Sequence, residues 1–316
     1  MKSKIILPLF SFCLFVLIAL SFEIVTRLLF PNINRQDTQL SLFREKVFGD
    51  SFGWQPNATG TSFDVDVIID DNGFRKMAVP DKCDVSWLIL GDSVTFGVGI
   101  KTGDTFVGML QKAFPNIRIW NTAVVGYSIE NYKDVIDYFI DSEKHIQKVL
   151  LFFTINDLYK GLNVQPTVRG FKKILFFLKR NSKFYILVKN LLFDRSESFF
   201  FYDYNLYDIA NPKFKNTLIV LDEIKRKLIA EDIDFIVILL PYEYQIRKKQ
   251  DDYLKPQKMM SSYFKAEEIQ FIDTYQHFIQ KDLDSKTFFL YADPMHLSKL
   301  GHQVVFDILV AQFNMN

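Results

Sequence analysis

The stretch Val85-Ser-Trp-Leu-Ile-Leu-Gly-Asp-Ser93 decides how this chain folds. Its first part, Val85 to Leu90, is largely apolar and is followed at once by Gly91. Short apolar runs that stop at a turn residue are typical of strands buried on both faces of a parallel sheet. Ligands bind outside the carboxyl ends of the strands in such sheets, so Ser93 falls where chemistry is expected.

The same kind of apolar run recurs four times along the chain. These further predicted strands span 117–120, 148–153, 235–240 and 269–272. Helical patterns fall between or after them, at 105–114, 127–141, 218–230 and 302–313. Strands that alternate with helices of this length predict an α/β fold, a three-layer doubly wound (flavodoxin-like) sandwich around a central parallel sheet.

Residues able to carry out acyl chemistry follow several of these strands. Ser93 follows the first strand, Gly126 lies past the second and Asn156 follows the third, while Asp293 and His296 lie near the C-terminus. His296 is the expected base for the Ser93 hydroxyl, and Asp293 the expected partner that fixes the imidazole tautomer. The backbone N–H groups of Ser93 and Gly126 and the Asn156 amide are expected to form an oxyanion hole.

These segments resemble the conserved blocks of the SGNH (GDSL-like) hydrolases. The matching segments are Gly91-Asp-Ser-Val-Thr-Phe-Gly-Val-Gly99, Asn121-Thr-Ala-Val-Val-Gly126, Thr154-Ile-Asn-Asp157 and Asp293-Pro-Met-His-Leu-Ser-Lys-Leu-Gly301. Asp71-Asn-Gly-Phe-Arg75 also looks like the membrane-anchored bacterial branch of the family. The resemblance covers about residues 60 to 313 and implies a catalytic triad of Ser93, Asp293 and His296. It departs from the family at Thr154, where a glycine is usual, so a narrower pocket or a tilted loop is expected there.

The resemblance implies a serine esterase that forms an acyl-enzyme. The expected substrate is an ester-linked acyl group, such as an O-acetyl group, on an extracytoplasmic small molecule or glycan. Two alternatives stay open: an O-acyltransferase that uses the same triad, and a non-catalytic envelope protein that binds glycans. Asp92 and Asp157 are expected to orient loops rather than to act on substrate.

The N-terminus reads as a membrane anchor over residues 1–30. Eighteen uncharged residues separate Lys4 from Glu23, which is the lower limit for a spanning helix. The lysines before this stretch predict a cytoplasmic N-terminus and an extracytoplasmic catalytic domain in a single-pass membrane protein. The alternatives are a signal peptide cleaved near Ala19-Leu-Ser21, which would give a secreted protein, and a buried core helix.

Two further regions complete the predicted organisation. Residues 31–80 are predicted to form an extension with a hairpin that precedes the main domain. In this hairpin a strand at 65–70 is followed by a turn at 72–73. Residues 81–316 read as the hydrolase domain, with a helical insertion near 165–200. Within it, the apolar but lysine-rich segment 171–193 is interpreted as a buried helical insertion, a cap over the site, or a surface that touches the bilayer.

Composition excludes several other classes of protein. The 38 Lys and Arg residues nearly balance the 37 Asp and Glu residues, which gives a net charge of +1 and argues against a nucleic-acid partner. Two cysteines, Cys13 and Cys83, do not make a disulfide scaffold or a four-ligand zinc site. We therefore expect no metal and no cofactor.

Overall fold

The computed structural model describes residues 3–78, 83, 85–142, 144–159 and 170–314 of the chain. Five parallel strands form its central sheet in the order β6-β5-β7-β8-β9. Their bounds are β5 (Val85–Leu90), β6 (Ile117–Asn121), β7 (Lys148–Phe153), β8 (Asp234–Leu239) and β9 (Gln270–Asp273). All five strands were predicted, each to within a residue. The chain passes from β5 to β6 on one side and then returns to β7 on the other, which places the switch point of the sheet beside β5.

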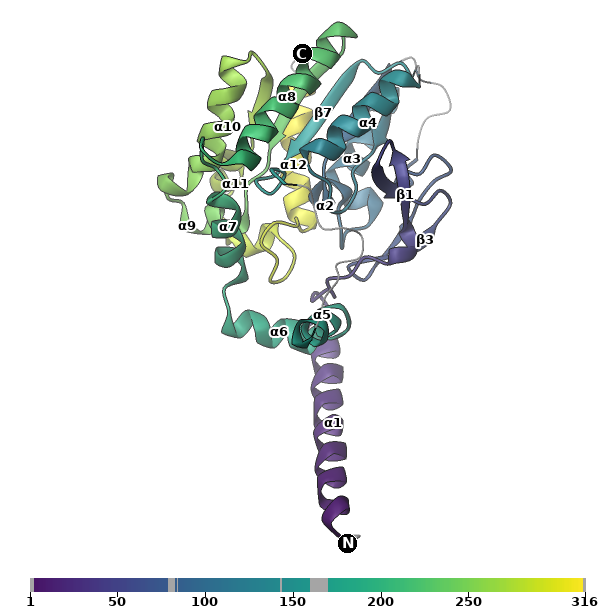
Figure 1. The fold of residues 1–316 in the computed structure, drawn as a ribbon, viewed down its shortest axis with the longest axis vertical. Coiled ribbons are helices and arrows are strands. Elements are labelled where there is room, and N and C mark those ends of the chain that lie inside the picture. The colour runs from purple at the N-terminus through teal and green to yellow at the C-terminus, as the bar shows by residue number, and fades with distance from the viewer. Residues whose placement is uncertain (1–2, 79–82, 84, 143, 160–169, 315–316) are drawn as a thin grey trace.

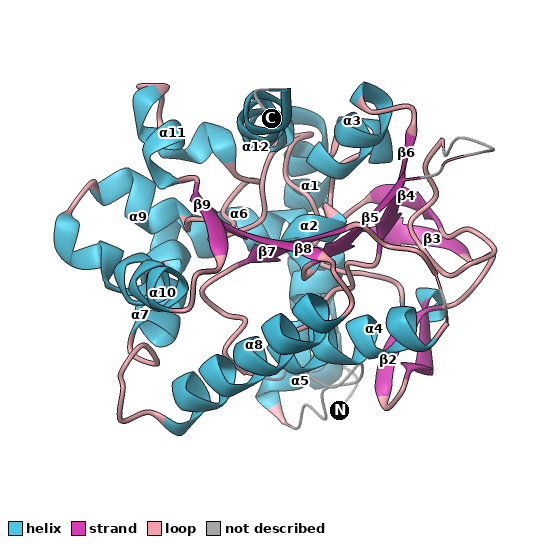
Figure 2. Ribbon diagram, turned by 90° about the horizontal axis from the view of Figure 1, so that it is seen from above, coloured by secondary structure: helices cyan, strands magenta, loops and turns pink. Residues whose placement is uncertain are grey.

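Helices cover both faces of this sheet, as the predicted sandwich requires. Figure 2 shows α3 (Phe106–Ala113) and α12 (Lys299–Asn314) on one face, and α4 (Ile129–Asp141) and α8 (Pro212–Ala230) on the other. The helix α8 begins before the predicted residue 218, because Asn211 caps its first turn by accepting from the Lys213 N–H at 2.9 Å. The other helices of this domain are α2 (Ser93–Phe96), α9 (Glu243–Lys248), α10 (Lys255–Ala266) and α11 (Tyr275–Gln280).

The middle strands of the sheet supply the centre of the hydrophobic core. Val149, Leu150, Leu151 and Phe152 of β7 are fully buried, and the Phe152 ring lies 4.4 Å from that of Phe106 on α3. Burying each such side chain contributes roughly 1.5–3 kcal/mol. A rigid sheet of this kind holds the loops at its carboxyl ends in fixed positions.

Two antiparallel hairpins precede the sheet. The strands β1 (Phe43–Phe48) and β2 (Ser51–Trp54) form the first, and β3 (Thr59–Ser62) and β4 (Val65–Ile68) form the second. The predicted strand at 65–70 therefore pairs with β3, across a turn in which Phe63 and Asp64 both have positive φ angles. The predicted turn at 72–73 closes a single bridge between Ile69 and Arg75. Trp54 fixes the hairpins to the main domain by donating its indole N–H to the Ala123 carbonyl at 2.9 Å.

The lysine-rich segment folds as helices. It forms α5 (Phe171–Asn181) and α6 (Lys183–Leu192), and α7 (Arg195–Tyr204) follows. Figure 1 shows α5 and α6 between the N-terminal helix and the sheet domain. Glu23 caps the start of α6, where it accepts from the Ser182 hydroxyl at 2.8 Å, and the Phe22 and Phe184 rings stack at 5.0 Å. The insertion is thus docked on the N-terminal helix.

The N-terminal helix α1 (Ser3–Leu29) projects away from the sheet domain (Figure 1). No helix within the described residues combines the length and the apolar character needed to cross a bilayer. The predicted transmembrane helix is therefore not confirmed. The predicted domain boundary at residues 80–81 and the start of the insertion near 165 lie outside the described residues.

Candidate active site

Ser93 is the first residue of α2, directly after β5. Asp92 caps this short helix, because its Oδ1 accepts from the Val94 N–H at 2.8 Å. A side chain at Gly91 would meet Thr95 Oγ1 at 2.1 Å, so only glycine allows the helix to turn this closely against the strand. The Ser93 side chain is held at the carboxyl edge of the sheet, where the residue keeps 8% of its surface exposed.

His296 and Asp293 reach Ser93 from the other end of the chain. The Nε2 atom of His296 lies 2.8 Å from Ser93 Oγ, and its Nδ1 atom lies 2.8 Å from Asp293 Oδ2. The other oxygen of Asp293 accepts from the backbone N–H groups of Met295, at 3.1 Å, and His296, at 2.9 Å. The structure therefore brings together the three residues that the sequence placed in one site, with serine and histidine within hydrogen-bonding distance.

The electrostatics of this group favour an ionised Asp293. Burial disfavours the charged carboxylate, but the neighbouring His296, Arg195 and the backbone hydrogen bond outweigh burial and lower the pKa of Asp293. A carboxylate facing Nδ1 holds the imidazole in the tautomer that leaves Nε2 free to accept the Ser93 proton.

The expected oxyanion-hole groups lie on loops that are tied to one another. Within the described part of the chain, the backbone N–H groups of Ser93 and Gly126 donate to no protein acceptor. The Gly126 loop is held by a bond from the Val124 N–H to the Gly91 carbonyl at 3.3 Å. Gly126 itself has a φ of +87°, which favours glycine. Neither N–H group is thus engaged by a protein acceptor in the described residues, and the Gly126 loop is tied to Gly91, two residues before the serine.

Thr154 contacts the predicted oxyanion-hole asparagine. Thr154 is buried, and its hydroxyl donates to the side-chain oxygen of Asn156. That contact orients the amide so that its nitrogen points toward Asp92, whose Oδ2 it reaches at 3.4 Å. The Thr154 hydroxyl therefore helps to fix the asparagine, while the expected tilt or narrowing stays a prediction.

Asp157 and Asp92 hold these loops in place, in keeping with the expectation. Asp157 accepts from the Thr154 N–H at 2.8 Å and from the Tyr132 hydroxyl at 3.0 Å. Its backbone carbonyl accepts from the Ile129 N–H at 3.1 Å, which joins the glycine loop to the asparagine loop. Burial raises the pKa of both carboxyl groups.

Three residues near the site were not assigned to it from the sequence, although Arg75 ends the Asp71–Arg75 segment noted there. Gln36 donates to Asp293 Oδ2 at 3.5 Å, and the edge of the Phe63 ring packs against the His296 ring at 5.2 Å. Arg75 is buried and donates to the Phe96, Gly97 and Ile100 carbonyls, which fixes the loop after α2. All three come from the N-terminal extension, and only their tertiary positions bring them to the site.

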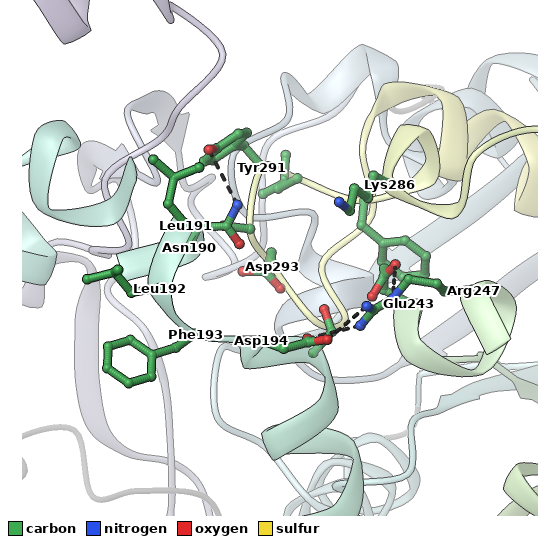
Figure 3. Close-up of a pocket in the computed structure, with 14 residues that line it drawn as sticks. Asn190, Leu191, Leu192, Phe193, Asp194, Glu243, Arg247, Lys286, Tyr291 and Asp293 are labelled. Atoms are coloured by element: carbon green, nitrogen blue, oxygen red, sulfur yellow. Dashed lines mark hydrogen bonds and ion pairs between the residues drawn. The ribbon is translucent and has the colours of Figure 1, made fainter. Parts of the chain in front are cut away.

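A cavity of about 510 Å³ adjoins the site at Asp293 (Figure 3). Its walls come from the end of α6, the start of α7, α9 and the loop before His296. Arg247 spans the cavity wall and pairs with Asp194 at 2.8 Å and Glu243 at 3.2 Å. A cavity of this volume accommodates a small molecule or a saccharide unit.

The described residues contain no cluster of three or more His, Cys, Asp and Glu side chains suited to a metal. Among the other histidines, His302 is fully buried and accepts from the Phe106 N–H at 3.2 Å. Burial, followed by the charges of Arg75 and His296, lowers the pKa of His302 to about 3. His302 is therefore a neutral part of the core beneath the site.

No model of a known protein family matches the sequence, and no curated protein matches it. Among solved structures, the chain is similar to an α/β hydrolase from the metagenome of Lake Arreo, with 15% identity over 72% of this chain and 94% of that one and a TM-score of 0.46. It is also similar to a putative lipolytic protein of the G-D-S-L family from Desulfitobacterium hafniense, with 15% identity over 72% of this chain and 99% of that one and a TM-score of 0.44. A third similar structure is an acetylxylan esterase from Geobacillus stearothermophilus, with 16% identity over 72% of this chain and 94% of that one and a TM-score of 0.46. The solved structures that the chain resembles thus include GDSL-type lipolytic proteins and acetylxylan esterases.

Proposed function

We propose that this protein is a serine esterase that cleaves ester-linked acyl groups through an acyl-Ser93 intermediate. The observation that carries the proposal is the pair of 2.8 Å contacts that His296 makes, one to Ser93 Oγ and one to Asp293. A serine hydroxyl needs such a base to become nucleophilic, and the base needs a partner that fixes its tautomer.

The reaction follows from these positions. Ser93 Oγ attacks the ester carbonyl carbon while its proton passes to His296 Nε2. The carbon–oxygen bond to the alcohol then breaks, and His296 returns the proton to the leaving oxygen. Water, deprotonated by His296 in turn, attacks the acyl carbon and releases the acid and free Ser93.

Negative charge develops on the carbonyl oxygen in each of these steps. We assign its stabilisation to the backbone N–H groups of Ser93 and Gly126 and to the side-chain amide of Asn156. Each donor of this kind typically contributes about 2.7–4 kcal/mol to transition-state stabilisation. The loops that bear them are tied together through Asp92 and Asp157, which supports a preformed site.

The substrate that we propose is an O-acetyl or similar ester on a glycan outside the cytoplasm. The test is to give the full-length protein an acetylated oligosaccharide with and without a deacetylated acceptor. Release of free acetate in both cases supports the esterase. Acetyl groups that appear only on the acceptor, with no free acetate, would replace it with an acyltransferase. Binding without any acyl chemistry would favour the glycan-binding alternative.

The location is a separate proposal: attachment to the cell membrane through the N-terminal helix, with the active site on the extracytoplasmic side. Apolar side chains of α1 are widely exposed, such as Phe15 at 68% and Leu28 at 74%, and this supports contact with an apolar phase. Recovery of the full-length chain in the membrane fraction, with the sheet domain open to external protease, would bear this out. A shortened chain in the medium would instead indicate signal cleavage and secretion.

A further inference from the structure

We propose that the helical insertion recognises negative charge on the substrate, so that the ester cleaved at Ser93 is carried by an acidic saccharide. This inference rests on the proposed esterase function and adds the chemical class of its substrate. Three positively charged side chains support the proposal. They are Lys179 near the end of α5, Lys189 in the last turns of α6, and Arg195 at the start of α7.

The segment that holds the two lysines has an unusual charge pattern. Residues 160–193 include eight Lys and Arg residues and not one Asp or Glu, although the whole chain has a net charge of only +1. The positive charges of this segment have no acidic side chain within the segment to pair with. Their negative partners must come from other parts of the protein or from a ligand.

The helices that bear these cations end near the loop that delivers the catalytic carboxylate, and Arg195 contacts that loop with its own side chain. Arg195 Nη1 donates to the Ala292 carbonyl at 3.1 Å, next to Asp293. The Lys179 carbonyl accepts at 3.4 Å from the N–H of Gln36, whose side chain reaches Asp293 at 3.5 Å. The side chain of Asn190, which follows Lys189, donates to the Tyr291 hydroxyl at 3.4 Å (Figure 3). The ends of all three helices thus border the 291–293 loop beside His296.

Other cations of the same insertion are paired within the protein. Arg180 forms an ion pair with Asp37 at 2.6 Å, and Lys183 lies 3.6 Å from Asp64. In the described part of the chain, no ion pair joins Lys179, Lys189 or Arg195 to an acidic side chain. The cations that dock the insertion therefore have acidic partners. Lys189 and Arg195 instead lie over the Tyr185 and Phe199 rings, and we call Lys179, Lys189 and Arg195 the open cations because no described acidic side chain forms an ion pair with them.

Burial and mutual repulsion disfavour the charged forms of the two lysines, which an anionic ligand would counteract. Burial and then the charge of Arg195 lower the pKa of Lys179 to about 8, and the same two causes lower the pKa of Lys189. Asp293 is the acidic group that acts on Lys179, but that carboxylate is already engaged by His296. A carboxylate or phosphate group on the substrate would neutralise this excess charge and gain strong hydrogen bonds.

An anionic membrane is the competing partner for a basic insertion. Lys172 and Lys173 are exposed, as are the apolar Ile174 and Phe177 on the same helix, and such a face suits a bilayer. The cations of the proposal differ from this face, because they are half-buried and border the catalytic loop. A saccharide bound next to Ser93 therefore fits them better than a lipid surface.

The direct test is binding by the full chain in neutral detergent, with oligogalacturonate as the acidic probe and dextran fragments of equal size as the neutral one. We expect the acidic probe to bind at least about tenfold more tightly at low salt. The Lys179→Gln/Lys189→Gln double variant should lose about tenfold in that affinity, whereas the matched Lys172→Gln/Lys173→Gln variant should change by less than about twofold. Equal affinity for both probes, or an equal loss in both variants, would overturn the proposal.

Further measurements distinguish a failure of the anion site from misfolding, from a failure of the proposed esterase function and from membrane binding. The Lys179→Gln/Lys189→Gln variant should unfold in a single cooperative thermal transition, as wild type does, which shows that the loss of affinity does not come from misfolding. If wild-type protein binds oligogalacturonate but hydrolyses no ester, the esterase is wrong while the anion site stands. If the variant loses binding to phosphatidylglycerol vesicles but keeps its affinity for oligogalacturonate, the cations serve the membrane and the proposal fails.

Discussion

The candidate site lies between two regions, the loops after the sheet strands (the sheet side) and the helical insertion α5–α7 (the insertion side). The two regions differ in whether their polar and charged side chains have partners within the protein. On the sheet side, the polar side chains of Ser93, Asp92 and Asn156 each have a partner within the protein. On the insertion side, the helices that bear Lys179 and Lys189 end near the same loop, and among the described residues neither lysine forms an ion pair with an acidic side chain. The comparison indicates that the reactive geometry is fixed before a substrate arrives, whereas the insertion carries positive charge that we propose an anionic substrate neutralises.

The sheet side is fixed because its loops are short and bonded to one another. Gly91, Asn156 and Asp157 all lie directly after central strands, and hydrogen bonds cross from one loop to the next. Preorganised donors of this kind stabilise a transition state without reorganisation. Variants on this side should therefore change the rate of the chemical step, and variants on the other side should change substrate binding.

The largest effect among these variants is expected for Asn156→Ala. Loss of one oxyanion donor should lower kcat for 4-nitrophenyl acetate by about 10²–10³-fold and leave KM nearly unchanged. Steady-state kinetics provide the measurement, and an unfolding curve provides the control for folding. A change in KM alone would mean that the amide binds the substrate in its ground state. That result would contradict the expectation that variants on the sheet side change the rate of the chemical step.

A pH effect follows from His302, the buried histidine beneath the sheet side. Its pKa falls from 6.5 to about 3 on folding, so the unfolded chain takes up a proton in that window and the folded chain does not. The contribution of His302 to stability is therefore complete above pH 6.5 and declines by about 1.4 kcal/mol per unit as the pH falls. Urea unfolding at several pH values should show a shallower decline for His302→Gln, and equal slopes would contradict the account.

A smaller effect is expected for substitutions of Thr154. Thr154→Val keeps the shape but removes the hydroxyl that fixes the Asn156 amide, so kcat should fall by about tenfold. Thr154→Ser keeps the hydroxyl and serves as the matched control with nearly full activity. If both variants behave alike, the hydroxyl does not position the asparagine.

The smallest effect is expected for Arg180→Gln, which breaks the ion pair with Asp37 on the insertion side. Both side chains are partly exposed, so the loss of stability should stay below about 1 kcal/mol. Affinity for oligogalacturonate should stay within about twofold of wild type, because this cation is already paired. A loss as large as that in the Lys179→Gln/Lys189→Gln variant would mean that overall charge matters more than the open cations.

The sequence allowed the sheet and the grouping of Ser93, Asn156, Asp293 and His296 to be predicted, because buried parallel strands have a clear apolar signature and their loops meet at one edge. It gave no sign of Phe63, which lies in the unpredicted turn between β3 and β4, or of Gln36, which precedes both hairpins in the chain. The open cations were also missed. A lysine looks the same in a sequence whether or not an aspartate lies across from it.

Labelling by a fluorophosphonate probe tests the central claim most directly. We expect one equivalent of probe per full-length chain at neutral pH, with the adduct on Ser93 by peptide mass spectrometry, no labelling of Ser93→Ala and normal labelling of the control Ser196→Ala. The account would be contradicted if folded wild-type protein took up no probe, or if Ser93→Ala were labelled as fast as wild type.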